Sequence, residues 1–109
     1  MKVAELEGDA LDYWVGVAQG LLVERNGGFC LREVSNGKHH YSPSTDWAEG
    51  GPIIEREQIR WQPMSDGTVF AWTHIVMPQM DPVNGMHGQT ILQASMRCFV
   101  ASKYGEEVE

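Results

Sequence analysis

The side chains of this sequence that could bind a metal ion are four histidines and two cysteines. Structural zinc sites usually hold two ligands close together, as in Cys-x-x-Cys, whereas Cys30 and Cys98 lie far apart in the chain. His39 and His40 are neighbours, but neighbouring side chains on a strand point to opposite faces of a sheet. The other two histidines each stand alone in the sequence. We therefore predict no metal site and no cofactor.

Residue patterns typical of catalysis are also missing from the sequence. Cys98 is predicted to lie on the apolar face of a helix, where a thiol is normally buried and unreactive. Glu55 and Glu57 flank Arg56 in a pattern that indicates a solvated surface and not a catalytic pair of carboxylates. The Gly-x-Ser-x-Gly, P-loop and dinucleotide-binding glycine motifs are absent. The sequence thus indicates no catalytic residue and favours a protein that is not an enzyme.

Residues 41–55 form a connection that is long for a compact domain, and such connections are commonly functional. Ser44 or Thr45 could cap a first short helix, which Gly50-Gly51 would end. Proline fits the first turn of a helix, so we expect a second short helix over residues 52–57. One interpretation of this partly helical insert is structural: it would cover an edge of the sheet and prevent edge-to-edge pairing.

The other interpretation of the same segment is a binding site. Tyr41 and Trp47 are large aromatic side chains that are costly to expose, so we expect an ordered segment. Trp47 is the tryptophan that we expect to be partly exposed, where it could anchor a contact with another molecule. The candidate ligand- or partner-binding residues are Tyr41, Ser42, Ser44, Thr45, Asp46 and Trp47.

Two amphipathic helices are predicted, one near each end of the sequence. The first covers residues 9–19, with Asp9 as its N-cap, Gly20 at its end and an apolar face formed by Leu11, Trp14, Val15 and Ala18. Gly16, inside this helix, indicates the close approach of another element. The second helix covers residues 89–104, with a mostly apolar stripe formed by Ile91, Leu92, Ser95, Cys98 and Phe99.

Between the helices, three turn signals predict antiparallel hairpins: Asn26-Gly27-Gly28, Asn36-Gly37 and Asp66-Gly67. We expect one antiparallel sheet of four or five strands, with the strand at 68–77 in the centre and the strand at 59–64, which contains a proline, at an edge. Trp61 and Trp72 are expected to pair across their hairpin, and residues 78–88 are predicted to form a loop. The resulting fold is α+β, with both helices on one face of the sheet.

Length and charge restrict the possible functions. The chain has 109 residues, enough for a single domain over 1–109. Residues 1–12 contain four acids and one lysine, residues 106–109 contain three acids, and the stretch between them contains eight acids and seven bases. This nearly neutral body lacks the basic stripe that neutralises phosphates, so the sequence does not favour nucleic-acid binding. The acidic ends could promote solubility, or could mimic nucleic acid toward a basic partner.

The sequence also indicates where the protein would work. No apolar run reaches the roughly 18 residues that a membrane span needs. The first residues contain acids where a signal peptide would have an apolar stretch. We therefore expect a soluble protein of the cytoplasm, with no contact to membranes, whose two cysteines stay reduced.

Three segments of the sequence are distinctive when they are taken together. They are Leu11-Asp12-Tyr13-Trp14-Val15, the run from Tyr41-Ser42-Pro43-Ser44-Thr45-Asp46-Trp47 to Glu55, and the run from Ala94 to Lys103. In these segments the chain resembles the NinX-like family of small, uncharacterised proteins of lambdoid phages and prophages. The resemblance implies a phage or prophage origin and expression in the cytoplasm of a bacterial host. It implies no reaction and no catalytic residue.

The leading hypothesis is a non-enzymatic phage or prophage accessory protein that binds a host or phage protein through residues 41–55. The alternative is a small-molecule-binding protein or enzyme with its pocket between this loop and the sheet. In that case Tyr41, Ser42, Thr45 and Asp46 would supply polar contacts, and Trp47 a stacking wall. A third hypothesis is nucleic-acid mimicry by the acidic ends. The sequence leaves the oligomeric state open.

Overall fold

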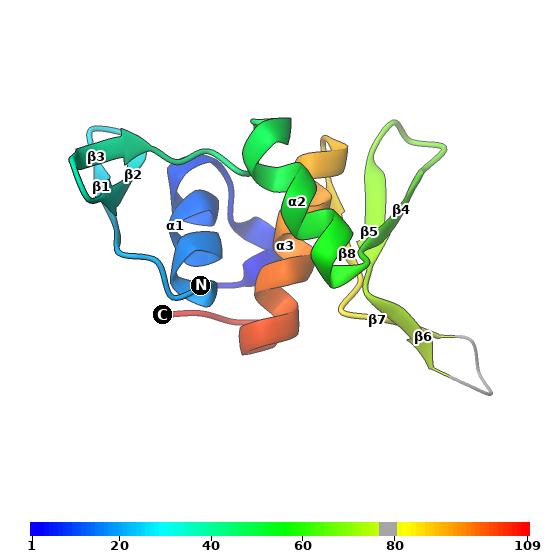
Figure 1. Cartoon of the computed structure of the whole chain (residues 1–109). Helices are drawn as coiled ribbons and strands as arrows, with labels where there is room; N and C mark the ends of the chain where they lie inside the picture. The colour runs from blue at the N-terminus through cyan, green and yellow to red at the C-terminus, as the bar shows by residue number, and fades with distance from the viewer. Residues whose placement is uncertain (77–80) are drawn as a thin grey trace.

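The helices of this protein lie between two small antiparallel sheets at opposite ends of an elongated molecule (Figure 1). The computed structural model describes residues 1–76 and 81–109. Its principal axes measure 49 × 26 × 26 Å, and the long axis runs from one sheet to the other. The described helices are the 3-10 helix η1 (Val3–Glu5) and the α-helices α1 (Gly8–Ala18), α2 (Trp47–Glu57) and α3 (Ile91–Tyr104).

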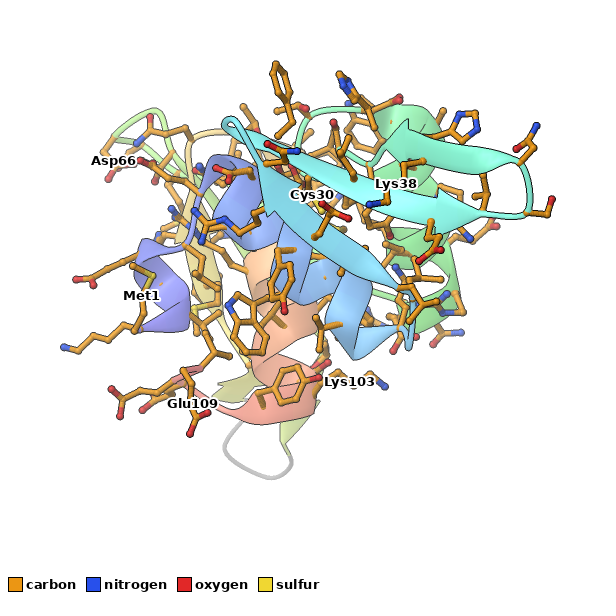
Figure 2. All side chains as sticks on the ribbon, turned by 90° about the vertical axis from the view of Figure 1, so that its left-hand side faces the viewer. Met1, Cys30, Lys38, Asp66, Lys103 and Glu109 are labelled. Carbon is orange, nitrogen blue, oxygen red and sulfur yellow. The ribbon has the colours of Figure 1, made fainter. Side chains whose placement is uncertain are left out.

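The first sheet has the strand order β1-β2-β3 and consists of β1 (Val23–Asn26), β2 (Phe29–Val34) and β3 (Gly37–His40). Its first hairpin is confirmed: Asn26 pairs with Phe29 around two glycines with φ angles of 62° and 86°, which other residues rarely adopt. The sheet lies across α1, as Figure 2 shows from the outer side of the sheet. A Cβ atom at Gly16 of α1 would lie 2.6 Å from Val23 Cγ1, so the predicted close approach is also confirmed.

The second sheet has the order β4-β5-β8 and consists of β4 (Arg60–Pro63), β5 (Val69–Trp72) and β8 (Met86–Gly88). As predicted, β5 is the central strand and β4, with its proline, is at an edge. Val69 and Ala71 are buried on the face of the sheet that packs against α3. Beyond this sheet, β6 (His74–Val76) and β7 (Asp81–Val83) form a separate two-stranded hairpin.

The prediction of one sheet of four or five strands, covered on one face by both helices, is wrong. α1 packs against the first sheet, and α3 packs against the second. The connection that contains α2 separates β3 from β4, and these two strands do not pair. Turn residues specify each hairpin locally, but nothing local specifies which hairpins join, so the turn signals alone could not distinguish one sheet from two.

Two predictions about the strands of the second half need correction. The strand expected at 68–77 ends at Trp72, and the chain continues as β6 in a different hairpin. The loop expected at 78–88 contains β7 and β8, and residues 77–80 lie outside the described part of the chain. The high content of β-branched and aromatic residues predicted extended structure correctly, but not where the chain would change sheets.

The expected pairing of Trp61 with Trp72 is also wrong. Trp61 lies opposite Ala71, and Trp72 lies opposite Arg60, so the two indoles point to opposite faces of the sheet. Trp72 instead stacks on Phe70, with the ring centroids 5.8 Å apart. A shift of one residue in the strand register reverses the face of each side chain, and the turn sequence did not determine that register.

The core is built around α3, which contacts α1, α2, η1 and the second sheet. The predicted stripe is buried along most of its length: Leu92, Ser95, Cys98 and Phe99 are inside, and Ile91 is partly buried. Thr90 caps this helix by accepting a hydrogen bond from the Gln93 N–H at 3.0 Å. Outside the stripe, Arg97 donates to the carbonyls of Leu6 and His87, at 2.8 Å each, and so ties the N-terminal segment to β8.

The predicted N-cap of the first helix is wrong. α1 begins at Gly8, and the capping position falls on Glu7, whose side chain makes no capping hydrogen bond. Asp9 lies in the first turn, where its carboxylate accepts a hydrogen bond from Arg25 Nε at 2.8 Å. The acidic residue therefore links α1 to β1 and also lies at the positive end of the helix dipole.

The prediction of two short helices in the insert is wrong, because α2 is a single helix over Trp47–Glu57. Its N-cap is Asp46, and neither Ser44 nor Thr45 has that role. Asp46 Oδ1 accepts a hydrogen bond from the Ala48 N–H at 2.9 Å.

α2 continues through Gly50-Gly51 and Pro52, which sequence propensity alone would use to end a helix. Gly50 is buried, and a Cβ atom there would lie 2.3 Å from the Pro43 carbonyl oxygen and 2.6 Å from Leu92 Cδ2. The absence of a side chain at Gly50 lets α2 pack directly against the preceding loop and α3. Tertiary packing therefore compensates for the low helix propensity of this stretch.

Replacement of Gly50 and of Gly51 by alanine should have opposite effects on stability. Gly50→Ala would force a backbone carbonyl away, so we expect a loss of about 1–3 kcal/mol in the free energy of unfolding. A Cβ atom at Gly51 would meet its nearest neighbour, Trp47 Cε3, at an ordinary 3.5 Å. Gly51→Ala should therefore raise stability by about 0.5–1 kcal/mol through helix propensity. Urea denaturation of both variants measures this, and equal effects would contradict the packing described for Gly50.

Candidate functional site

The segment predicted to bind a ligand or partner forms a ridge, residues 42–47, between two hollows. The acidic hollow, of about 220 Å³, is lined by Asp9, Asp12, Phe29, Cys30, Ser42 and Thr45, together with two glycines. The Trp47 groove, of about 310 Å³, is lined by Ser44, Thr45, Trp47, Thr90, Ile91 and Leu92. Thr45 borders both hollows, so the ridge separates a hollow beside α1 and the first sheet from a groove beside the start of α3.

Backbone hydrogen bonds shape the ridge. The Ser42 carbonyl accepts hydrogen bonds from the N–H groups of Thr45, at 3.0 Å, and Asp46, at 2.8 Å. The Ser42 N–H donates to Glu49 Oε1 at 2.7 Å, which ties the start of the ridge to α2. The ridge is therefore an ordered turn that leads directly into the capped N-terminus of α2, in agreement with the expectation of an ordered segment.

The base of the ridge is held by Asp12 of α1. The Ser44 N–H donates to Asp12 Oδ1 at 2.8 Å, and both residues are buried, with exposed fractions of 4% and 5%. Burial raises the pKa of the Asp12 carboxyl from 3.8 to about 6, although the hydrogen bond from the Ser44 N–H opposes this rise. The Ser44 hydroxyl lies close enough to lower this pKa as well, but its geometry does not complete a hydrogen bond to any described residue.

Tyr41, directly before the ridge, anchors the segment in the core. Its ring is only 3% exposed, and its hydroxyl oxygen accepts a hydrogen bond from the Gln19 side-chain amide at the end of α1. The Arg32 guanidinium carbon lies 5.8 Å from the centroid of the ring. Burial raises the pKa of the Tyr41 hydroxyl. Tyr41 is therefore located where it positions the ridge, and its ring does not lie on the surface.

The other predicted residues differ in exposure. Ser44 is buried, Ser42 is partly buried, and Thr45 and Asp46 are exposed, with Asp46 occupied as the cap of α2. Trp47 is 52% exposed, which agrees with the expectation for this side chain, and its neighbours in the groove are Ile91 and Leu92. The surface that another molecule could touch is thus formed mainly by Thr45, Asp46 and Trp47.

Of the residues that line the acidic hollow, sequence reasoning proposed only Ser42 and Thr45 as site residues and missed the others, among them Asp12 and Phe29. Asp12 lies directly after Leu11 and three residues before Val15, so it falls within the buried stripe of α1. A carboxylate at such a position was a detectable signal of a buried polar contact. Phe29, which is 55% exposed, stacks on His40 with the ring centroids 4.8 Å apart. No sequence pattern distinguished this phenylalanine from a core residue.

The described residues show little that could support catalysis or metal binding. No three His, Cys, Asp or Glu side chains among them come together in a group that could hold a metal ion. Burial raises the pKa of Cys30 to about 11 and that of Cys98 to about 12, so neither thiol is activated as a nucleophile at neutral pH.

A further hollow, of about 300 Å³, lies where the two ends of the chain meet. It is lined by Lys2, Ala4, Met86, Glu106 and Glu107. Backbone hydrogen bonds hold the two ends of the chain together here, since the Val3 N–H donates to the Glu106 carbonyl at 2.9 Å. The described residues of this lining include exposed charged groups but no aromatic side chain and no cysteine or serine, so they offer less for recognition than those of the hollows beside the ridge.

The family model described as Bacteriophage P22, NinX matches residues 2–103 of this chain. The chain belongs to this family. The resemblance to NinX-like phage proteins is thereby confirmed, and it places the protein among phage accessory proteins. The match includes the ridge and every residue that lines the two hollows beside it. A search of curated proteins gave no significant match. None of the described helices is long and apolar enough to cross a membrane.

The buried Asp12 carboxyl should make stability depend on pH. Its pKa is higher in the folded protein than in the unfolded chain, so the folded state binds this proton more tightly. Its contribution to the free energy of unfolding therefore falls as the pH rises from about 4 to about 6, by at most about 3 kcal/mol. Asp12→Asn keeps an acceptor for the Ser44 N–H and removes the ionisation. Relative to the original protein, this variant should gain stability over that pH range, measured by urea denaturation.

Asp66 provides a control of opposite sign. The Thr68 hydroxyl and N–H donate to Asp66 Oδ1, at 2.7 and 3.0 Å, and these hydrogen bonds lower the pKa of this carboxyl. The ionised Asp66 carboxylate stabilises the folded protein above the pKa that this group has in the unfolded chain, and this stabilisation is lost as the pH falls. Asp66→Asn should therefore lose stability, relative to the original protein, as the pH rises. A stability difference for Asp12→Asn that does not change with pH would show that Asp12 is not the group assigned here.

Proposed function

We propose that this phage accessory protein acts by binding another protein, of the phage or of its bacterial host, in the cytoplasm. The binding surface is the ridge together with the Trp47 groove. The observation that supports this proposal most strongly is Trp47. It is 52% exposed at the start of α2, in a groove of about 310 Å³ that Ile91 and Leu92 also line. Tryptophan is among the residue types that dominate the energetics of protein interfaces.

The rigidity of the ridge is the second argument for this function. The Ser42 carbonyl, the Asp46 cap and the Asp12–Ser44 hydrogen bond fix the backbone before any partner arrives. A surface that is already ordered loses less conformational entropy on binding, which favours recognition. The apolar groove beside Trp47 can accept one large side chain, and Asp46 and Thr45 offer polar contacts around it.

A small-molecule site is the competing function, and the geometry favours it less. Ligand pockets typically measure about 300–1,000 Å³ and enclose most of their ligand. The acidic hollow, at about 220 Å³, is below that range, and Trp47 in the larger groove leaves half of its surface in water. An exposed aromatic side chain between two small hollows is more typical of a contact surface between proteins than of an enclosed ligand pocket.

Trp47→Ala should weaken partner binding at least about tenfold, because it removes the aromatic anchor. Trp61→Ala is a matched control, since Trp61 is 41% exposed and lies on β4 of the other sheet. Both variants should remain folded. The measurement is quantitative recovery of partners from lysates of the phage-infected or lysogenic host, with the original protein and the two variants as baits.

A photo-crosslinking amino acid at each of the same two positions locates the contact directly. The proposal expects a crosslinked product with one host or phage protein from position 47, and none from position 61. Equal recovery of partners by both variants, or crosslinks from position 61 only, would exclude the ridge as the binding surface.

A further inference from the structure

The acidic hollow is lined by two carboxyl groups, whereas the described residues that line the Trp47 groove carry no charge. Burial is the main cause that raises the pKa of Cys30 in the wall of this hollow, and the nearby charges of Asp12, Asp9 and Glu49 raise it further, whereas Arg25 lowers it. The carboxylates that line the hollow itself are those of Asp9 and Asp12. Arg25 is already paired with Asp9, at 2.8 Å. Of the two carboxylates that line the hollow, Asp12 is therefore the one that no cation pairs with among the described residues.

Asp12, which lines this hollow, has one carboxylate oxygen without a donor among the described residues. The side chain is 95% buried, and its hydrogen bond from the Ser44 N–H uses Oδ1 and leaves Oδ2 free to accept another. The Ser44 hydroxyl, close to the same carboxyl, is buried without a hydrogen-bond partner in the described part of the chain. A buried carboxylate normally accepts more than one hydrogen bond, so the site favours a ligand that donates them.

Phe29 forms an aromatic wall of the same hollow. Its ring is 55% exposed, and it stacks on His40 at an interplanar angle of 16°. A cation placed against the exposed part of this ring would gain from its negative π-face, and a flat guanidinium can lie parallel to it. The hollow thus combines a buried carboxylate with an exposed aromatic ring, two groups that proteins use to bind arginine side chains.

We propose that the acidic hollow accepts a basic side chain of the protein partner, and that arginine fits it best. The guanidinium would donate to Asp12 Oδ2 and stack against Phe29. This inference rests on the proposed function and names the chemistry of the partner. Because Thr45 borders both hollows, one short segment could place an arginine in the acidic hollow and an apolar side chain in the Trp47 groove. The formal charge of −7 on the whole chain would attract such a segment.

Titration of the full chain with N-acetyl-arginine-N-methylamide, followed by NMR, tests this proposal. We expect saturable shifts of the Ser44 and Thr45 amides and of the Asp12 carboxyl carbon, with a Kd of about 1–10 mM. The lysine analogue should bind more weakly, and the citrulline analogue, which is neutral and similar in shape, should cause no saturable shift. Arginine should also lower the pKa of the Asp12 carboxyl, because a bound cation favours its ionised form.

Two variants make the result specific to this hollow. Asp12→Asn should weaken arginine binding at least about fivefold. Glu55→Gln, which removes one exposed negative charge from α2, should leave binding unchanged. Equal losses in the two variants would show general attraction to an acidic protein and would overturn the proposal. Absence of saturable shifts up to about 50 mM arginine analogue would overturn it as well.

Failure of the arginine proposal can be distinguished from failure of the proposed function. If Trp47→Ala abolishes partner binding while the arginine analogue gives no saturable shift, the ridge remains the binding surface and the arginine proposal is wrong. If arginine binds through Asp12 while Trp47→Ala retains its partners, the hollow binds cations but the ridge is not the surface that the partner uses.

Discussion

The hydrogen bond from the Ser44 N–H to the Asp12 carboxyl joins the ridge to α1, and the position of both hollows depends on it. It is a buried contact between residues 32 positions apart, and it costs free energy to keep the carboxylate away from water. The same burial raises the pKa of Asp12. A buried polar contact of this kind contributes more to a defined backbone geometry than to overall stability, and defined geometry is what a recognition surface needs.

The remainder of the fold supplies the frame for this contact. α3 forms the centre of the core and separates the second sheet from α1, while α1 carries the first sheet on its other side (Figure 1). Each small sheet buries one face against a helix, which is the usual way in which a short sheet becomes stable. Gly50 then lets α2 pack tightly against the loop before it and against Leu92, so the ridge is held from α1, α2 and α3 together.

Membership of the phage NinX family places this protein among phage accessory proteins. The exposed aromatic side chains Phe29 and Trp47 lie in two different hollows that meet at Thr45. One hollow is acidic and the other is mainly apolar, so a partner that bound both, as we propose, would need both kinds of side chain. Such a requirement would add specificity to the general attraction between an acidic protein and basic partners.

The sequence by itself determined the elements that depend on local signals. The spacing of Leu11 and Val15, the stripe from Leu92 to Phe99, and the Asn-Gly-Gly and Asp-Gly turns predicted α1, α3 and two hairpins, because helix period and turn geometry are set by neighbouring residues. The partial exposure of Trp47 was also anticipated. Tertiary structure alone decided that the hairpins form two sheets, that α2 continues through Gly50-Gly51, and that Trp61 and Trp72 point to opposite faces. It also decided that Tyr41 is buried and that Asp12 faces the ridge, because burial and register depend on contacts between residues far apart in the chain.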